Sequence, residues 1–156
     1  MRVEKITIKH NLYEQPDLSY LGEYSNTPGE YCIDRQERGD MDRGEYRYFN
    51  LGCGDPEYLE QDYARMKACD DGLWCMLGIV AEAQVSYSIG NGSKRLETLT
   101  SDGLWGVESD SDKELDVIDQ EELDDLRECL KQFGIVCSDE RWAELCEEAK
   151  NNIVED

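Results

Sequence analysis

Alternating apolar and polar residues form the clearest pattern in the chain, in the segment 75–89. From Glu82 onward, the odd positions are apolar and the even positions are polar. A period of two predicts a β-strand with one buried and one solvated face. The turn Gly90-Asn91-Gly92 tolerates positive φ and predicts a hairpin to a second strand at 94–100. Shorter strands are predicted at 3–9, 46–51 and 104–107.

Apolar residues at helical spacing predict three helices. Asp55, Pro56 and Gly72 are typical of the two ends of a helix over 55–72. A second helix has apolar residues three and four apart and ends at Gly134: Leu123, Leu126, Leu130 and Phe133. Ser138 is a suitable N-cap for a third, with an inner face formed by Trp142, Leu145, Ala149 and Ile153.

The chain of 156 residues has the length of one domain. We predict a single acidic α+β domain over 1–156, with an antiparallel sheet of about four strands and about three helices packed on one of its faces. Residues 1–44 are expected to be a mostly irregular N-terminal segment, because 10–44 are rich in Gly, Asp, Asn, Pro and Tyr. One short strand is expected near 31–34. Acidic helices are expected over 117–153.

The charge of the chain is unusual. Asp and Glu number 37 and Lys and Arg number 16, so the net charge is −21. Residues 102–156 hold 19 acids and 5 bases, a net of −14, which is two thirds of the excess. This balance argues against direct binding of nucleic acid or of an anionic membrane through a large basic surface, and an electrostatically recognised partner should be basic. No stretch approaches the roughly 18 apolar residues of a membrane span, and the chain is expected to be soluble and to stay in the compartment where it is made.

Closely spaced carboxylates form the first candidate site. Glu121, Asp124, Asp125 and Glu128 share one helix face, because residues three and four apart are neighbours on a helix. Six more acids lead into them: Glu108, Asp110, Asp112, Glu114, Asp116 and Asp119. A rigid surface of spaced carboxylates can compete for a protein site that is built for phosphates. The alternative interpretation is an ordinary solvated helix face.

Other chemistry is weakly signalled. Residues 110–121 place oxygen ligands at alternate positions, as in a calcium-binding loop, but Leu115 stands where the sharp turn needs glycine. His10 is the only histidine, and no nucleophile elbow or phosphate-binding glycine loop is present. The seven cysteines show no Cys-x-x-Cys spacing and are expected to be reduced thiols. We therefore expect no catalytic residue, no metal and no cofactor.

Three segments carry a resemblance to known proteins. Asp62-Tyr-Ala-Arg65-Met66, residues 74–83 and residues 103–112 resemble a family of small acidic proteins of phages, plasmids and other mobile elements. The resemblance covers roughly residues 45–135. It implies an anti-defence protein, of the antirestriction or anti-CRISPR kind, some of which imitate DNA, in the cytoplasm of a bacterial host cell. It implies no particular functional residue.

The leading hypothesis is a non-enzymatic inhibitor. It would bind the basic nucleic-acid-binding site of a host defence nuclease or CRISPR effector by DNA or RNA mimicry. One alternative is an immunity protein or antitoxin that neutralises a basic toxin through the same electrostatics. Another is an enzyme that degrades a signalling nucleotide or modifies a host defence target. A homodimer would extend the acidic surface.

Overall fold

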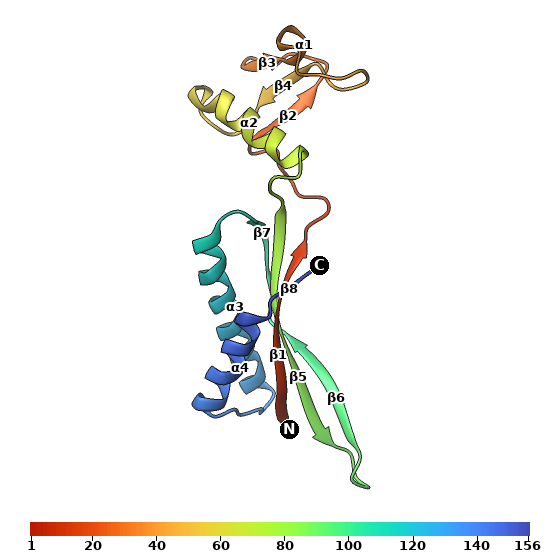
Figure 1. The fold of residues 1–156 in the computed structure, drawn as a ribbon, viewed down its shortest axis with the longest axis vertical. Helices are drawn as coiled ribbons and strands as arrows, with labels where there is room; N and C mark the ends of the chain where they lie inside the picture. Colours follow the sequence, from red (N-terminus) through yellow and green to blue (C-terminus); the bar gives the residue numbers. More distant parts are fainter. The chain divides into compact units, whose positions relative to one another are not determined.

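The computed structural model describes all 156 residues and confirms the mixed α+β class (Figure 1). The chain divides by its contacts into two compact units: residues 1–14 with 75–156, here the larger unit, and residues 15–74, the smaller unit. Each unit is described separately. In chain order the elements are β1 (Arg2–Leu12), β2 (Gly22–Ser25), β3 (Cys32–Asp34), α1 (Arg35–Arg38), β4 (Tyr48–Leu51), η1 (Pro56–Tyr58), α2 (Leu59–Asp70), β5 (Met76–Ser88), β6 (Lys94–Thr100), β7 (Leu104–Glu108), α3 (Asp112–Gln132), α4 (Asp139–Asn151) and β8 (Val154–Glu155).

A five-stranded sheet forms the larger unit. Its order is β6-β5-β1-β8, and β7 pairs with the first residues of β5. The sheet is antiparallel except for the two-residue strand β8, which runs parallel to β1. The predicted hairpin of β5 and β6 is confirmed, as is the alternation of β5, because Ile79, Ala81, Ala83 and Val85 are at most 1% exposed.

Two helices cover one face of this sheet, as Figure 1 shows for α3 and α4. The predicted cap of α4 is confirmed, since Ser138 Oγ accepts a hydrogen bond from the Arg141 amide at 3.2 Å. Helix α3 begins at Asp112, well before the apolar spacing that starts at Leu123. The expectation of three helices on one sheet is wrong: α2, the helix predicted over 55–72, belongs to the smaller unit.

The structure corrects the expectation that 1–44 is mostly irregular. Strand β1 of the larger unit occupies residues 2–12 and confirms the strand predicted at 3–9. In the smaller unit, β2 and β3 flank β4 in an antiparallel sheet of order β2-β4-β3. Phe49 is fully buried, and the centroid of its ring lies 5.6 Å from that of Tyr24 and 5.1 Å from that of Tyr63 of α2. Strands of three or four residues are too short to show a period of two, so the sequence pattern missed β2.

A buried arginine holds the loops of the smaller unit. The guanidinium of Arg35 donates to the Tyr46 carbonyl and to Glu45 Oε2, both at 2.8 Å, and stacks over the Tyr24 ring at 4.6 Å. The Tyr24 hydroxyl donates to Asp70 Oδ2 at 2.6 Å. Burial, assisted by this bond, raises the pKa of Tyr24. The Tyr24 side chain therefore anchors this part of the smaller unit, whereas Tyr46 contributes its backbone carbonyl and keeps an exposed side chain.

Candidate functional site

Helix α3 carries the candidate site because its two faces differ in composition. It holds nine acids and three bases in 21 residues. Leu123, Leu126 and Leu130 are at most 1% exposed and pack into the core with β1, β5 and α4. Burial of three leucines fixes the helix on the sheet, at roughly 1.5–3 kcal/mol for each side chain. The carboxylates on the outer face are therefore presented by a rigid element.

The outer face of α3 forms what we call the acidic stripe. Its members recur three, four and seven residues apart, and all are exposed: Glu114, Glu121, Asp124, Asp125 and Glu128. Only one stripe residue has a cationic partner, as Lys131 Nζ lies 2.6 Å from Glu128 Oε1. Asp124 accepts from the Gln120 amide at 2.9 Å. The carboxylates of the stripe repel one another, and few cations of the chain neutralise them. This face therefore attracts external cations more strongly than a balanced helix surface does.

Three other predicted acids lie on the surface near the start of α3. Asp110, Asp112 and Asp116 are exposed, whereas Glu108 is half-buried at the end of β7 and has an interaction partner. The segment considered as a calcium loop is mostly helical, since α3 begins at Asp112. No group of three or more His, Cys, Asp or Glu side chains is arranged to hold a metal ion.

Asp119 was predicted as part of the acidic site, and the structure removes it from that site. Its side chain is buried, and Oδ1 lies 2.7 Å from Nε2 of His10, a buried residue of β1. A partner protein cannot reach this carboxyl group, so Asp119 is a structural residue. Sequence spacing contained the signal, because Asp119 lies four residues before Leu123 and seven before Leu126, on the inner face of the helix.

Glu122 is a second buried acid of α3. Its Oε2 accepts from the Ser101 hydroxyl at 2.5 Å and from the Gly103 amide at 3.1 Å. Ser101 Oγ in turn accepts from the Ala81 amide at 3.0 Å. This network ties α3 to the turn between β6 and β7 and to β5, and it removes Glu122 from the surface charge.

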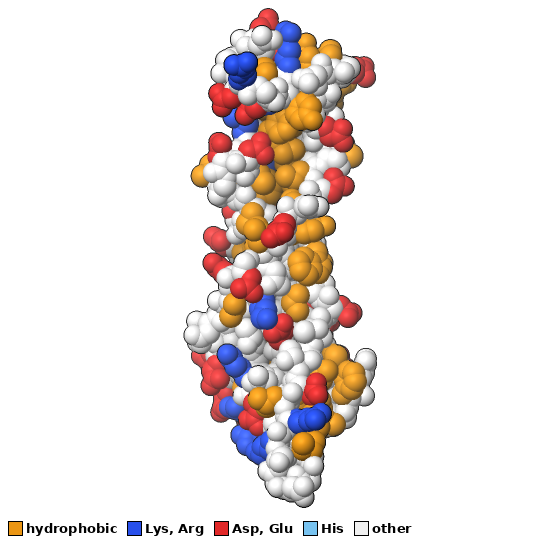
Figure 2. All heavy atoms as spheres, turned by 90° about the vertical axis from the view of Figure 1, so that its right-hand side faces the viewer, with side chains coloured by type: hydrophobic (Ala, Val, Ile, Leu, Met, Phe, Trp, Pro, Cys, Tyr) orange, Lys and Arg blue, Asp and Glu red, His pale blue; other side chains and the backbone are white.

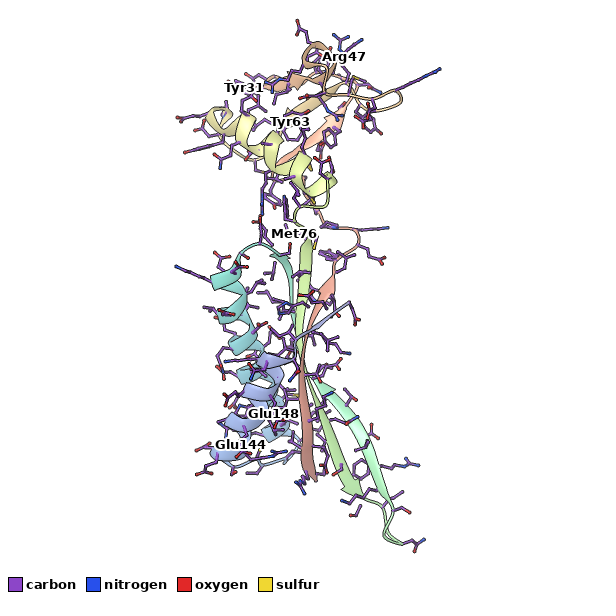
Figure 3. The ribbon with its side chains drawn as sticks, viewed as in Figure 1. Tyr31, Arg47, Tyr63, Met76, Glu144 and Glu148 are labelled. Carbon is purple, nitrogen blue, oxygen red and sulfur yellow. The ribbon has the colours of Figure 1, made fainter.

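Helix α4 adds acids that the sequence-based site omitted. Glu140, Glu144, Glu147 and Glu148 are exposed, and Figure 3 shows Glu144 and Glu148 on this helix. An ion pair joins the two helices: Nη2 of Arg127 in α3 lies 2.5 Å from Oδ1 of Asp139, the first residue of α4. The spacing of these four glutamates, three and four residues apart, could have predicted an acidic face from the sequence. The acidic surface therefore continues from α3 onto α4.

The opposite face of the larger sheet has a different character. Residues of β1 alternate, so Lys5 and Lys9 face away from the two helices. Lys9 Nζ pairs with Glu82 Oε2 of β5 at 2.9 Å. In the lower part of Figure 2, which views this side, Lys and Arg side chains lie among the carboxylates. Within this unit, strands β1 and β5 thus mix the two signs of charge, and α3 and α4 carry the acidic excess.

A pocket of about 330 Å³ lies beside His10 in the larger unit. Its lining includes Cys75 and Ser109, so the residue types of a nucleophile and a base meet there. However, the Ser109 hydroxyl oxygen accepts a hydrogen bond from the Cys75 backbone amide at 2.9 Å. Nε2 of His10 is hydrogen-bonded to Asp119. No hydrogen bond links the imidazole to either candidate nucleophile. The arrangement supports a structural role for His10.

No disulfide bond joins any of the seven cysteines. Cys146 of α4 is buried, and burial raises the pKa of its thiol to about 11. A thiol with this pKa is almost fully protonated at neutral pH and is a poor nucleophile. Cys146 therefore behaves as a small apolar core residue.

No known protein family, curated protein or solved structure matches the chain in the comparisons. The resemblance to proteins of mobile elements stays a prediction. None of the helices combines the length and the apolar character that crossing a membrane would require.

Replacement of His10 by alanine is expected to destabilise the larger unit by about 3 kcal/mol, because removal of one member of a buried pair leaves the other uncompensated. Chemical denaturation followed by circular dichroism measures this change. His10→Gln is the matched control, as its amide can still donate to Asp119 and should recover part of the loss. A His10→Ala midpoint equal to that of the wild type would contradict the structural role.

Proposed function

We propose that the chain is a non-enzymatic inhibitor that occupies the basic nucleic-acid-binding site of a host defence nuclease or CRISPR effector. The observation that carries the proposal is the acidic stripe, in which five exposed carboxylates stand on a rigid helix with one cationic partner among them. A basic site built for phosphates attracts such a surface through the same electrostatics that attract nucleic acid. The cytoplasm of the host cell is the compartment that this role requires.

The spacing of the stripe suits phosphate mimicry. Carboxylates three or four residues apart on a helix stand about 5 Å apart along its axis, since each residue rises about 1.5 Å. Phosphates of one DNA strand recur about every 3.4 Å along the duplex axis. The stripe therefore has about two thirds of the linear charge density of one strand. The neighbouring acids of α4 widen the charged surface beyond a single line.

The same surface suits other basic partners. An immunity protein or antitoxin would neutralise a basic toxin through the same carboxylates. Competition by nucleic acid distinguishes these functions. Added nucleic acid should displace the chain from a nuclease or effector, but not from a toxin that acts on another target. An enzyme would differ in stoichiometry, because one molecule would inactivate many targets.

Affinity capture followed by titration tests the proposal. Immobilised chain should capture a nucleic-acid-binding protein from a bacterial lysate at low salt, and added duplex DNA should release it. Inhibition of the purified target should be complete at about one chain per binding site, as expected for a tight stoichiometric complex. Binding that is unchanged between low and high salt, or inactivation at far lower ratios, would overturn the proposal.

A further inference from the structure

Strand β6 leaves one edge of the larger sheet without a neighbour. It pairs with β5 on one side, and no strand pairs with its other side (Figure 1). All of its residues except Leu99 are exposed. An open edge presents unpaired backbone N–H and C=O groups, which are able to pair with a strand of another chain. The edge is seven residues long, which is enough for a ladder of hydrogen bonds.

The ladder between β5 and β6 shows which residues of β6 point outward. At its two ends the Ser101 amide donates to the Ala81 carbonyl at 2.9 Å, and the Ile89 amide donates to the Ser93 carbonyl at 3.1 Å. Hydrogen-bonded positions alternate in an antiparallel pair, so the odd residues of β6 bond to β5. The N–H and C=O groups of Lys94, Leu96, Thr98 and Thr100 therefore face outward. A partner strand must pair with these even residues.

We propose that β6 binds β6 of a second copy of this chain, in an antiparallel pairing centred on Leu96. In this register Leu96 lies opposite its own copy, and Arg95 of each chain lies opposite Glu97 of the other. The outward groups of 94, 96 and 98 then form about six hydrogen bonds, two for each hydrogen-bonded pair. The two Leu96 side chains, each 58% exposed in one chain, cover each other.

Charge complementarity selects this register from its neighbours. A symmetric pairing centred on Arg95 places two arginines opposite each other, and one centred on Glu97 places two carboxylates opposite each other. Like charges directly opposite are destabilising, whereas opposite charges stabilise a strand pair. A symmetric pairing centred on Thr98 forms no ion pair between the two β6 strands. Only the Leu96 register makes two ion pairs, and it makes both by symmetry.

The two charged side chains are suitably placed for this pairing. Both lie on the same face of β6, opposite Tyr87 and Val85 of β5. Glu97 Oε1 accepts from the Tyr87 hydroxyl at 3.0 Å, which orients the carboxylate and leaves its second oxygen for Arg95 of the other copy. Arg95 has no ion pair within its own chain, so it gains its partner on association.

The net charge of −21 opposes self-association, but the β6 edge lies in a segment of different charge. Residues 88–100 contain Lys94, Arg95 and Glu97 as their only charged residues, a net of +1. The interface therefore falls where electrostatic repulsion between copies is weak. The interface is small, and we expect a dimer with a Kd of about 1–100 µM.

Charge exchange between β6 strands tests the proposal by sedimentation equilibrium, without any other partner. The wild type should dimerise. Arg95→Glu and Glu97→Arg should each weaken the dimer by about tenfold or more, because each places like charges opposite one another. An equimolar mixture of the two variants should form a heterodimer, since every 95–97 contact between the two chains is then an ion pair again.

A backbone variant separates pairing from side-chain effects. Leu96→Pro removes an outward N–H and spares the bonds to β5, so the chain should stay folded by circular dichroism and become monomeric. A monomeric wild type at concentrations above this Kd range would overturn the dimer. A dimer that tolerates both charge variants, or a mixture that forms no heterodimer, would overturn the register. Because no target is present, these outcomes are independent of the proposed inhibition.

Discussion

Reversal of Asp124, Asp125 and Glu128 to lysine is expected to weaken binding to the basic target by at least about 100-fold, which corresponds to about 2.7 kcal/mol. Each substitution replaces an attraction by a repulsion at the centre of the acidic stripe. All three side chains are exposed, so the fold should survive. Lysine at 125 also gains a favourable contact with Glu121, four residues earlier on the helix. Calorimetry or surface plasmon resonance against the captured target measures the change.

A matched variant separates the position of the charge from its amount. Reversal of Glu23, Glu30 and Asp71, exposed acids of the smaller unit, raises the net charge from −21 to −15, as the first variant does. We expect this control to keep most of the affinity and to lose only long-range steering. Equal loss in both variants would show that total charge, and not the stripe, determines binding.

Replacement of Val85 by aspartate is expected to unfold the larger unit. Val85 is 1% exposed and belongs to the core that β1, β5 and the two helices form. An unpaired carboxylate at this depth costs several kcal/mol, a large part of the roughly 5–15 kcal/mol that stabilises a typical domain. Circular dichroism should show loss of the helical signal of α3 and α4 or a strongly lowered melting temperature.

The neighbouring residue provides the control for this variant. Gln84→Asp introduces the same carboxylate on the same strand, but Gln84 is exposed on the other face of the sheet. We expect a change below about 1 kcal/mol, as for most exposed substitutions. Glu82→Gln should be similarly mild, because it removes only the partly exposed pair with Lys9. A wild-type melting temperature for Val85→Asp would show that the buried face of β5 is wrongly assigned.

Local pattern was sufficient for the long elements of the larger unit. The alternation in 82–89 and the glycine turn after it predict β5 and its hairpin, because one face of that strand is in the core and the other in water. The cap at Ser138 and the spacing of Trp142, Leu145 and Ala149 predict α4 for the corresponding reason. The acidic stripe could also be predicted, since Glu121, Asp124, Asp125 and Glu128 fall on one helix face by spacing alone.

Tertiary contacts decided which acids are available to a partner. Asp119 and Glu122 belong to the same acidic helix as the stripe, but their side chains are buried. There they form hydrogen bonds with His10 of β1 and with Ser101 of the turn between β6 and β7. A buried carboxyl group is stable only when such partners are present, and their positions depend on the folded sheet.

Periodicity and composition were enough to predict the α+β class, the main hairpin, the two C-terminal helices and the concentration of negative charge near the C-terminus. The separate small sheet of residues 15–74, the placement of α2 against it and the open edge of β6 are seen in the folded chain alone. They could not be predicted because they arise from pairing between distant segments. Hydrophobic periodicity records which side of an element is buried, and it does not record which other element covers that side.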